Sequence, residues 1–77
     1  PNPSNNSTNI GYSSTNSENI SFEITNLLGE VILQQNFVSN VGLNNISVNT
    51  SMFSNGVYLY SVSNGLVRST KRLIVHH

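Results

Sequence analysis

The chain has 77 residues, with three acidic and three basic side chains, a formal net charge of zero and no cysteine. A chain of this length forms one domain at most, and without cysteine it has neither a disulfide bond nor a thiolate metal site. The balanced charge argues against a nucleic-acid partner, because such binding needs several Lys or Arg side chains to displace counterions. The longest apolar run, Val57–Tyr60, is far too short to insert into a membrane.

The few charges are distributed unevenly along the chain. All acids lie in the first thirty residues and all bases in the last ten: Glu18, Glu23 and Glu30 against Arg68, Lys71 and Arg72. Isolated charges most often only solvate a surface, but a basic C-terminal segment also suits a patch that a partner recognises. We therefore take Arg68, Lys71 and Arg72 as candidate recognition residues.

The N-terminal residues 1–6, PNPSNN, are incompatible with a helix. Pro3 favours an extended conformation at Asn2, and Asn and Ser favour turns, so this segment is predicted to be a linker that leads into the domain. Thr8, Ile10 and Tyr12 then alternate with polar or small residues, which predicts a strand at a sheet edge.

The next segment, 20–25, alternates cleanly between apolar and polar residues, which is typical of an antiparallel strand with one buried and one solvated face. Residues 26–30 are predicted to form a turn in which Gly29 takes a positive φ angle. A strand follows over residues 31–37. After Gly42, alternation over residues 46–49 predicts another strand.

The stretch Val57–Tyr60 is apolar at every position, which suits a strand that is buried on both sides or central in its sheet. Asn64-Gly65 is a strong hairpin sequence, because a type I′ turn needs two positive φ angles. A two-residue loop there predicts that Tyr58 faces Lys71, and that the last strand runs from about Leu66 to Val75.

Six or seven short strands and no helical spacing predict an all-β fold, an antiparallel β-sandwich in which two packed sheets each bury one face. The candidates for acid–base chemistry are three Glu and the terminal His76 and His77, so we expect no enzyme activity, no metal and no cofactor. The Tyr and Phe residues suit either a sugar-binding platform or core packing, and core packing is the commoner role.

Four segments in order, PNPS, ISFEITNLLGEVI, GLNNISVNTSMFSNGVYLYSV and TKRLIV, resemble the type A C-terminal sorting domain of the Bacteroidetes type IX secretion system. The matching positions are Pro1, Asn2, Pro3, Gly29, Asn55, Gly56, Val57, Tyr58, Lys71, Leu73 and Val75. The Tyr that precedes PNP in the family is missing. Asn26 stands where the family often has Asp, and Met52 or Phe53 where it often has Leu.

The resemblance implies an immunoglobulin-like β-sandwich that serves as a C-terminal secretion and sorting signal, over residues 7–75. His76 and His77 are either native residues or the remains of a purification tag. The implied partners are the outer-membrane translocon, a sortase-like peptidase that removes the domain, and a cargo domain N-terminal in the same chain. The cargo would pass through the periplasm to the cell surface or the extracellular medium. Recognition would use the basic residues or strand addition at an open edge.

A carbohydrate-binding or spacer module of a secreted enzyme is the alternative. A binding module should retain polysaccharide and can lie anywhere in its parent protein, whereas a sorting domain ends it. Open edges at the first and last strands also make a strand-exchanged dimer conceivable.

Overall fold

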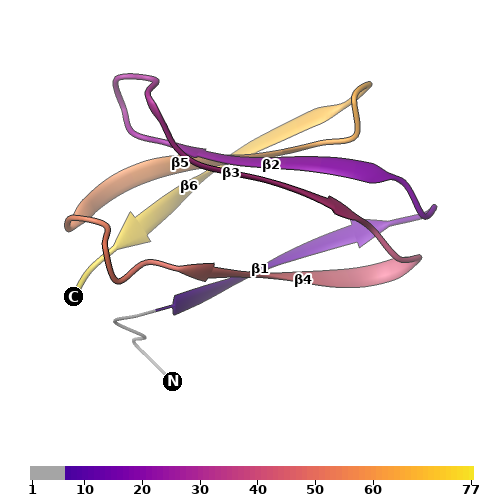
Figure 1. Cartoon of the computed structure of the whole chain (residues 1–77), viewed down its shortest axis with the longest axis horizontal. Helices are drawn as coiled ribbons and strands as arrows, with labels where there is room; N and C mark the ends of the chain where they lie inside the picture. Colours follow the sequence, from indigo (N-terminus) through magenta and orange to yellow (C-terminus); the bar gives the residue numbers. More distant parts are fainter. Residues whose placement is uncertain (1–6) are drawn as a thin grey trace.

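The computed structural model describes residues 7–77, and within this range it contains six β-strands and no helix (Figure 1). The strands are β1 (Ser7–Ser14), β2 (Asn19–Thr25), β3 (Val31–Val38), β4 (Gly42–Asn49), β5 (Gly56–Ser63) and β6 (Arg68–Val75). The all-β prediction is confirmed. The predicted linker, together with Pro1, Asn2 and Pro3, lies outside the described residues. Among residues 7–77, no helix has the length and apolar character to cross a membrane.

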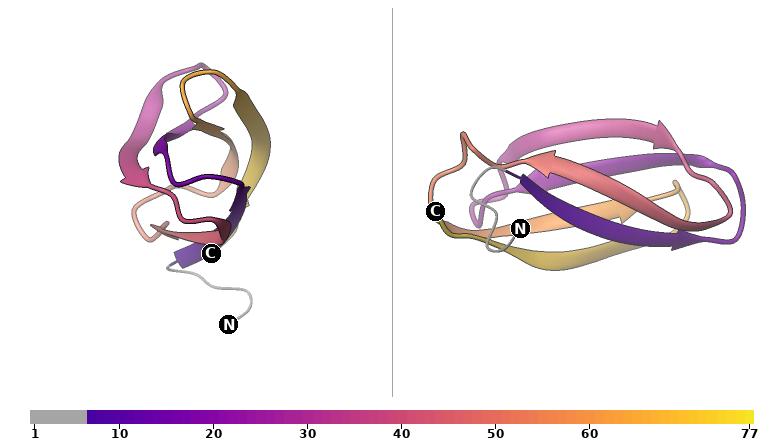
Figure 2. Two further views of the ribbon diagram at one scale, coloured as in Figure 1. Left: turned by 90° about the vertical axis from the view of Figure 1, so that its right-hand side faces the viewer. Right: turned by 90° about the horizontal axis from the view of Figure 1, so that it is seen from below.

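The strands form two sheets, one of two strands in the order β1-β4 and one of four strands in the order β3-β2-β5-β6. Every pairing is antiparallel. The two sheets lie one above the other and enclose the core, so the fold is the predicted immunoglobulin-like sandwich (Figures 1 and 2). We call the face of the large sheet that meets the small sheet its inner face, and the opposite one its outer face.

The core follows from the alternation of β2. Ile20, Phe22 and Ile24 are at most 1% exposed, while the residues between them point to the outer face. The complete buried cluster is Ile10, Ile20, Phe22, Ile24, Ile46, Val48, Tyr58, Val62, Leu73 and Val75. Tyr12 and Tyr60 pack against this cluster, so the aromatic residues serve as core packing, as predicted.

The turn between β2 and β3 has the predicted glycine geometry, with φ of 90° at Gly29. The side-chain oxygen of Asn26 accepts hydrogen bonds from the backbone N–H groups of Leu28 (3.0 Å) and Glu30 (2.9 Å). Its amide nitrogen donates to the Glu30 carboxylate at 2.6 Å. An Asp could accept the same backbone bonds but could not donate to Glu30, which explains how Asn suits this position.

Strand β5 lies between β2 and β6, so it is central in its sheet rather than buried on both sides. Tyr58 and Val62 are buried in the core, whereas Val57 is 38% exposed. Of the two predicted environments for Val57–Tyr60, the structure therefore shows the central strand, with its outer face exposed to solvent.

The connection between β5 and β6 differs from the prediction. Four residues, 64–67, link the strands instead of a two-residue loop. Gly65 has φ of 95°, but Asn64 lacks the positive φ of a type I′ turn. Its side-chain oxygen instead accepts hydrogen bonds from the N–H groups of Leu66 (2.9 Å) and Val67 (2.8 Å), which closes a wider loop.

The wider loop moves the register of the hairpin by two residues. Tyr58 lies opposite Leu73, and Lys71 lies opposite Tyr60, so the predicted Tyr58–Lys71 pair is wrong. The last strand begins at Arg68 rather than Leu66. Because side chains alternate with a period of two, a shift of two residues leaves each β6 side chain on its predicted face.

Candidate recognition surface

The three candidate recognition residues all lie on β6, which is an edge strand of the large sheet. They do not share one face. Leu73 and Val75 are buried in the core, so Lys71, two residues earlier, belongs to the inner face. Arg68 and Arg72 belong to the outer face. The basic patch predicted from sequence is therefore divided between the two sides of the strand.

Arg68 is neutralised by an acidic neighbour. Its guanidinium donates to the Glu23 carboxylate at 2.8 Å, across the intervening strand β5. The Arg68 side chain is 55% exposed and that of Glu23 29%, so this is a surface ion pair of modest energy.

Arg72 has a different environment, although it lies on the same face and strand. Its register partner is Leu59, and Ile74 follows it on the outer face. Within residues 7–77 the Arg72 side chain forms no ion pair and no hydrogen bond, and neither does that of Lys71. Neither β5 nor β6 contains an acidic residue.

The outer face has two halves of contrasting chemistry. The half near the β5–β6 loop is polar, and its side chains bond to one another. Ser61 and Thr70 share a hydrogen bond of 2.9 Å, and Gln34 donates to Asn36 at 2.8 Å. We call this region the polar half; it also contains the Arg68–Glu23 ion pair.

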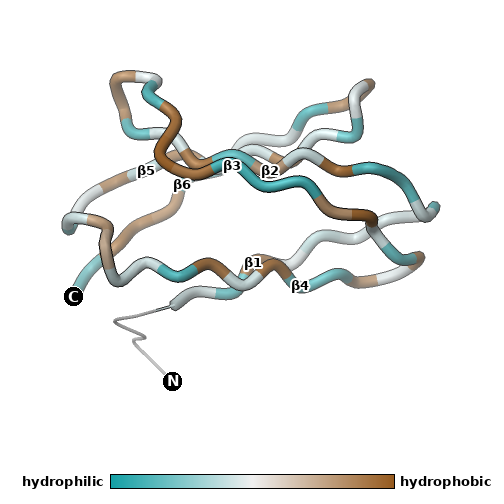
Figure 3. Tube along the Cα trace, viewed as in Figure 1, coloured by the Kyte–Doolittle hydropathy of each residue, from teal (hydrophilic) through white to brown (hydrophobic). Residues whose placement is uncertain are grey.

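The other half lies toward the β2–β3 turn and the end of β6. Register places Val57 beside Ile74 and Leu59 beside Arg72. Ile74 is 67% exposed. We call Val57, Leu59 and Ile74, together with the Arg72 that they flank, the apolar patch. The tip of the β2–β3 hairpin and the start of β3, at the same end of the sandwich, are also hydrophobic (Figure 3).

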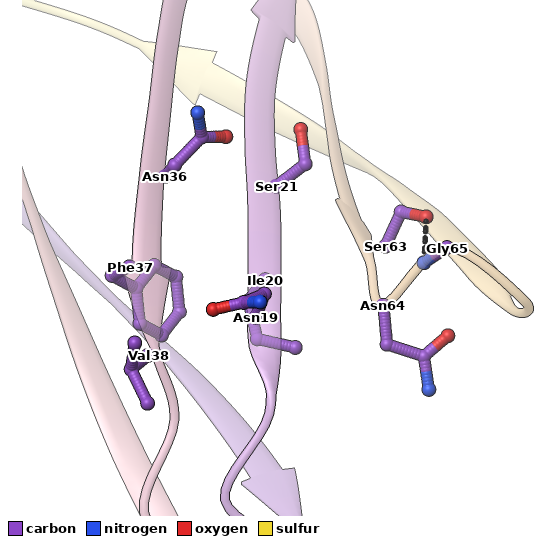
Figure 4. A pocket seen from close by; sticks show the side chains of 9 residues that line it. All are labelled: Asn19, Ile20, Ser21, Asn36, Phe37, Val38, Ser63, Asn64 and Gly65. Atoms are coloured by element: carbon purple, nitrogen blue, oxygen red, sulfur yellow. Dashed lines mark hydrogen bonds between the residues drawn. The ribbon is translucent and has the colours of Figure 1, made fainter.

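A shallow pocket of about 570 Å³ lies at the opposite end of the large sheet (Figure 4). Its lining comes from β2, β3, the end of β5 and the start of the β5–β6 loop: Asn19, Ile20, Ser21, Asn36, Phe37, Val38, Ser63, Asn64 and Gly65. The polar lining is uncharged. The pocket includes none of the three bases, although Ser63, which lines it, is the register partner of Arg68.

The family-motif positions within the described residues have mainly structural roles. Tyr58 is buried, its hydroxyl donates to the Ser54 carbonyl at 2.7 Å, and its ring lies 5.2 Å from that of Phe53. Phe53, rather than the 91% exposed Met52, therefore packs where the family often has Leu. Asn55 accepts a hydrogen bond from the backbone N–H of His77 at 2.9 Å.

Sequence analysis missed the apolar patch as a surface. The predicted register does not pair Ile74 with Val57, and the prediction for Val57–Tyr60, a strand buried on both sides or central in its sheet, does not specify which of its side chains are exposed. The alternation of Arg72 and Ile74 with buried Leu73 and Val75 was the pattern that could have revealed it. Among the described residues, no group of three or more His, Asp or Glu side chains could hold a metal ion.

Comparison with known proteins gives one finding. The model of a family described as secretion system C-terminal sorting domain matches residues 1–76. No curated protein and no solved structure matches the chain. The match spans nearly the whole sequence, including the turns and strands described above. The chain therefore belongs to the secretion system C-terminal sorting domain family, and it is a C-terminal sorting signal of the type IX secretion system.

Proposed function

We propose that this domain, once folded, is recognised by the outer-membrane translocon of the type IX system and directs a cargo domain N-terminal in the same chain across that membrane. The route runs through the periplasm to the cell surface or the extracellular medium, and a sortase-like peptidase removes the domain. The domain itself contributes recognition and no catalysis. The observation that supports this proposal is the family match over residues 1–76.

The family match also favours sorting over a carbohydrate-binding or spacer module. A sorting domain of this family implies a type IX cargo and export toward the cell surface or beyond. The specific receptor and peptidase are part of the proposal.

We propose strand β6 as the element that the translocon contacts. All the Lys and Arg residues of the chain, Arg68, Lys71 and Arg72, lie on this one edge strand, and Lys71 and Arg72, on its two faces, have no acidic partner within residues 7–77. A cluster of bases at a sheet edge attracts an acidic receptor and accelerates its encounter with the domain.

A secreted reporter tests the proposal. A fluorescent protein with a periplasmic signal peptide is fused to residues 1–77 and produced in a bacterium with and without the type IX translocon. We expect extracellular or surface fluorescence only when the translocon is present. Replacement of Lys71 and Arg72 by Gln should reduce export, and unchanged export of the folded double variant would exclude basic docking.

Strand exchange between copies stays a prediction. Of the two strands named in that prediction, β1 carries no charged side chain that would oppose pairing with a second chain, and neither does its partner β4, whereas β6 carries three bases. Sedimentation equilibrium over a range of concentrations would measure the dimer directly.

A further inference from the structure

We propose that the apolar patch, Val57, Leu59, Arg72 and Ile74, is the docking surface of the domain, and that its partner is a protein surface which pairs a carboxylate with apolar side chains. This inference rests on the proposed function, because the partner is then the translocon. Within the basic strand, it assigns the central contact to Arg72 rather than to Arg68 or Lys71.

The first argument is charge. On the outer face, Arg68 already has Glu23 at 2.8 Å, so a second carboxylate would gain little there. Arg72 has no counter-ion within residues 7–77, and β5 and β6 contain no acid that could provide one. An incoming carboxylate would make the first ion pair of Arg72, and Arg can bind both carboxylate oxygens at once.

The second argument is the exposed apolar area around this cation. Ile74 is 67% exposed and Val57 38%, and half-buried Leu59 follows Val57 on the outer face of β5, opposite Arg72. Arg is enriched at the energetically dominant centres of protein interfaces, and apolar neighbours such as Leu59 and Ile74 help to exclude water from an ion pair that Arg72 forms there. The polar half, by contrast, already satisfies its side chains internally.

The third argument excludes Lys71 from the same contact. Lys71 belongs to the inner face of β6, opposite Tyr60, while Arg72 belongs to the outer face. A partner that covers the outer face therefore reaches Arg72 and Ile74 without touching Lys71.

Chemistry also distinguishes the partner from other occupants. In a symmetric dimer the same patch meets itself, which would bring two Arg72 side chains together with no acid of the patch to separate them. Binding to an anionic membrane needs a cluster of several bases near the surface, whereas this patch contains one. A protein surface with its own carboxylate avoids the repulsion between two Arg72 side chains and can bind through the single base of this patch.

The reporter fusion tests this inference with matched pairs of variants. Arg72→Gln is compared with Arg68→Gln, which removes the same charge from the same strand and face. Ile74→Thr is compared with Val67→Thr, because both residues are β-branched, apolar and 67% exposed. Lys71→Gln serves as the inner-face comparison, and unfolding of each purified variant shows whether it still folds.

We expect Arg72→Gln and Ile74→Thr each to reduce translocon-dependent export, and the double variant to reduce it by about tenfold, as for truncation at an interface hot spot. Arg68→Gln, Val67→Thr and Lys71→Gln should leave export within about twofold of the parent. If the Arg72→Gln and Ile74→Thr variants were exported to the cell surface or medium in the same amount as the parent fusion, the inference would be overturned.

Four further outcomes are informative. If all three charge variants lose export equally, net charge rather than the apolar patch is recognised, and the inference fails while the proposed function survives. If the unmodified fusion is never exported through the translocon, the proposed function itself fails. Sedimentation of the chain as a dimer that Ile74→Thr dissociates, or flotation with phosphatidylglycerol vesicles that Arg72→Gln abolishes, would assign the patch to those occupants instead.

Discussion

Consecutive residues in the four-stranded sheet point to its two opposite faces and have different environments there. On β2, Phe22 is fully buried on the inner face, while the next residue, Glu23, forms a surface ion pair on the outer face. On β6, Leu73 is buried in the core, while Ile74 is 67% exposed. The inner face therefore holds the fold together, and the outer face is the one we propose as the docking surface. If that proposal is correct, inner-face substitutions should lower stability and outer-face substitutions should lower export.

The largest expected effect is on the inner face. Phe22→Ala should lower the free energy of unfolding by about 3–5 kcal/mol, because it removes a large buried side chain from the centre of the core. In a domain this small such a loss is comparable with total stability. Urea denaturation followed by circular dichroism measures it, and a loss below about 1 kcal/mol would contradict the core assignment.

The next effect concerns the turn that joins β2 to β3. Gly29→Ala should cost about 1–2 kcal/mol, because Gly29 has φ of 90° and a Cβ atom is unfavourable in this conformation. A Cβ there would meet no other atom within 4 Å, so the cost is conformational and not steric crowding by neighbours. The control is Gly11→Ala, which lacks a positive φ; an equal loss there would contradict the explanation.

A smaller effect is expected for the ion pair of the polar half. A double-mutant cycle with Glu23→Gln and Arg68→Gln should give a coupling energy of about 0.2–1 kcal/mol, since both side chains are partly solvated. The coupling should decrease in high salt. A value that is insensitive to salt would mean that the pair is more shielded than its exposure indicates.

The smallest expected effect on stability is at Arg72, and it distinguishes the outer face from the inner face most directly. Arg72→Gln should change the free energy of unfolding by no more than about 0.5 kcal/mol, because Arg72 is exposed and has no partner within residues 7–77. Thermal unfolding of the purified domain checks this value. A large destabilisation would mean that Arg72 supports the fold, and its export defect could then not be attributed to docking.

Periodicity and turn residues were sufficient to predict the general fold from sequence. Strand β2 was predicted almost to its bounds because its apolar residues alternate without interruption. The positive φ of Gly29 was predicted because few other residues tolerate it. The family resemblance added the function, which no local pattern of residues could supply.

Features that depend on side-chain hydrogen bonds escaped prediction. The hairpin register was wrong because Asn64 bonds to Leu66 and Val67 instead of taking a positive φ. Ser39 is fully buried, and its hydroxyl donates to the Asn16 carbonyl at 3.0 Å and accepts from the Glu18 N–H at 3.2 Å. Nothing local in the sequence marks this serine as the link between two loops.

The sequence predicted which bases form the candidate site but not how they are arranged, because the arrangement depends on strand pairing. The three bases were identified by composition, but their division between faces depends on which β6 residues enter the core. The contrast between Arg68 and Arg72 depends on Glu23, which is 45 residues from Arg68 along the chain. Such pairings follow from strand order, which a single sequence does not specify.

The position of β6 in the chain has a consequence for biosynthesis. The ribosome makes this strand after the other five, yet it provides Leu73 and Val75 to the interior and Arg72 and Ile74 to the exterior. A polypeptide that is released early or clipped before residue 72 thus loses part of its interior and its proposed export determinant together. Under the proposed docking model, export would thus require that strand β6 is both present and folded into the large sheet.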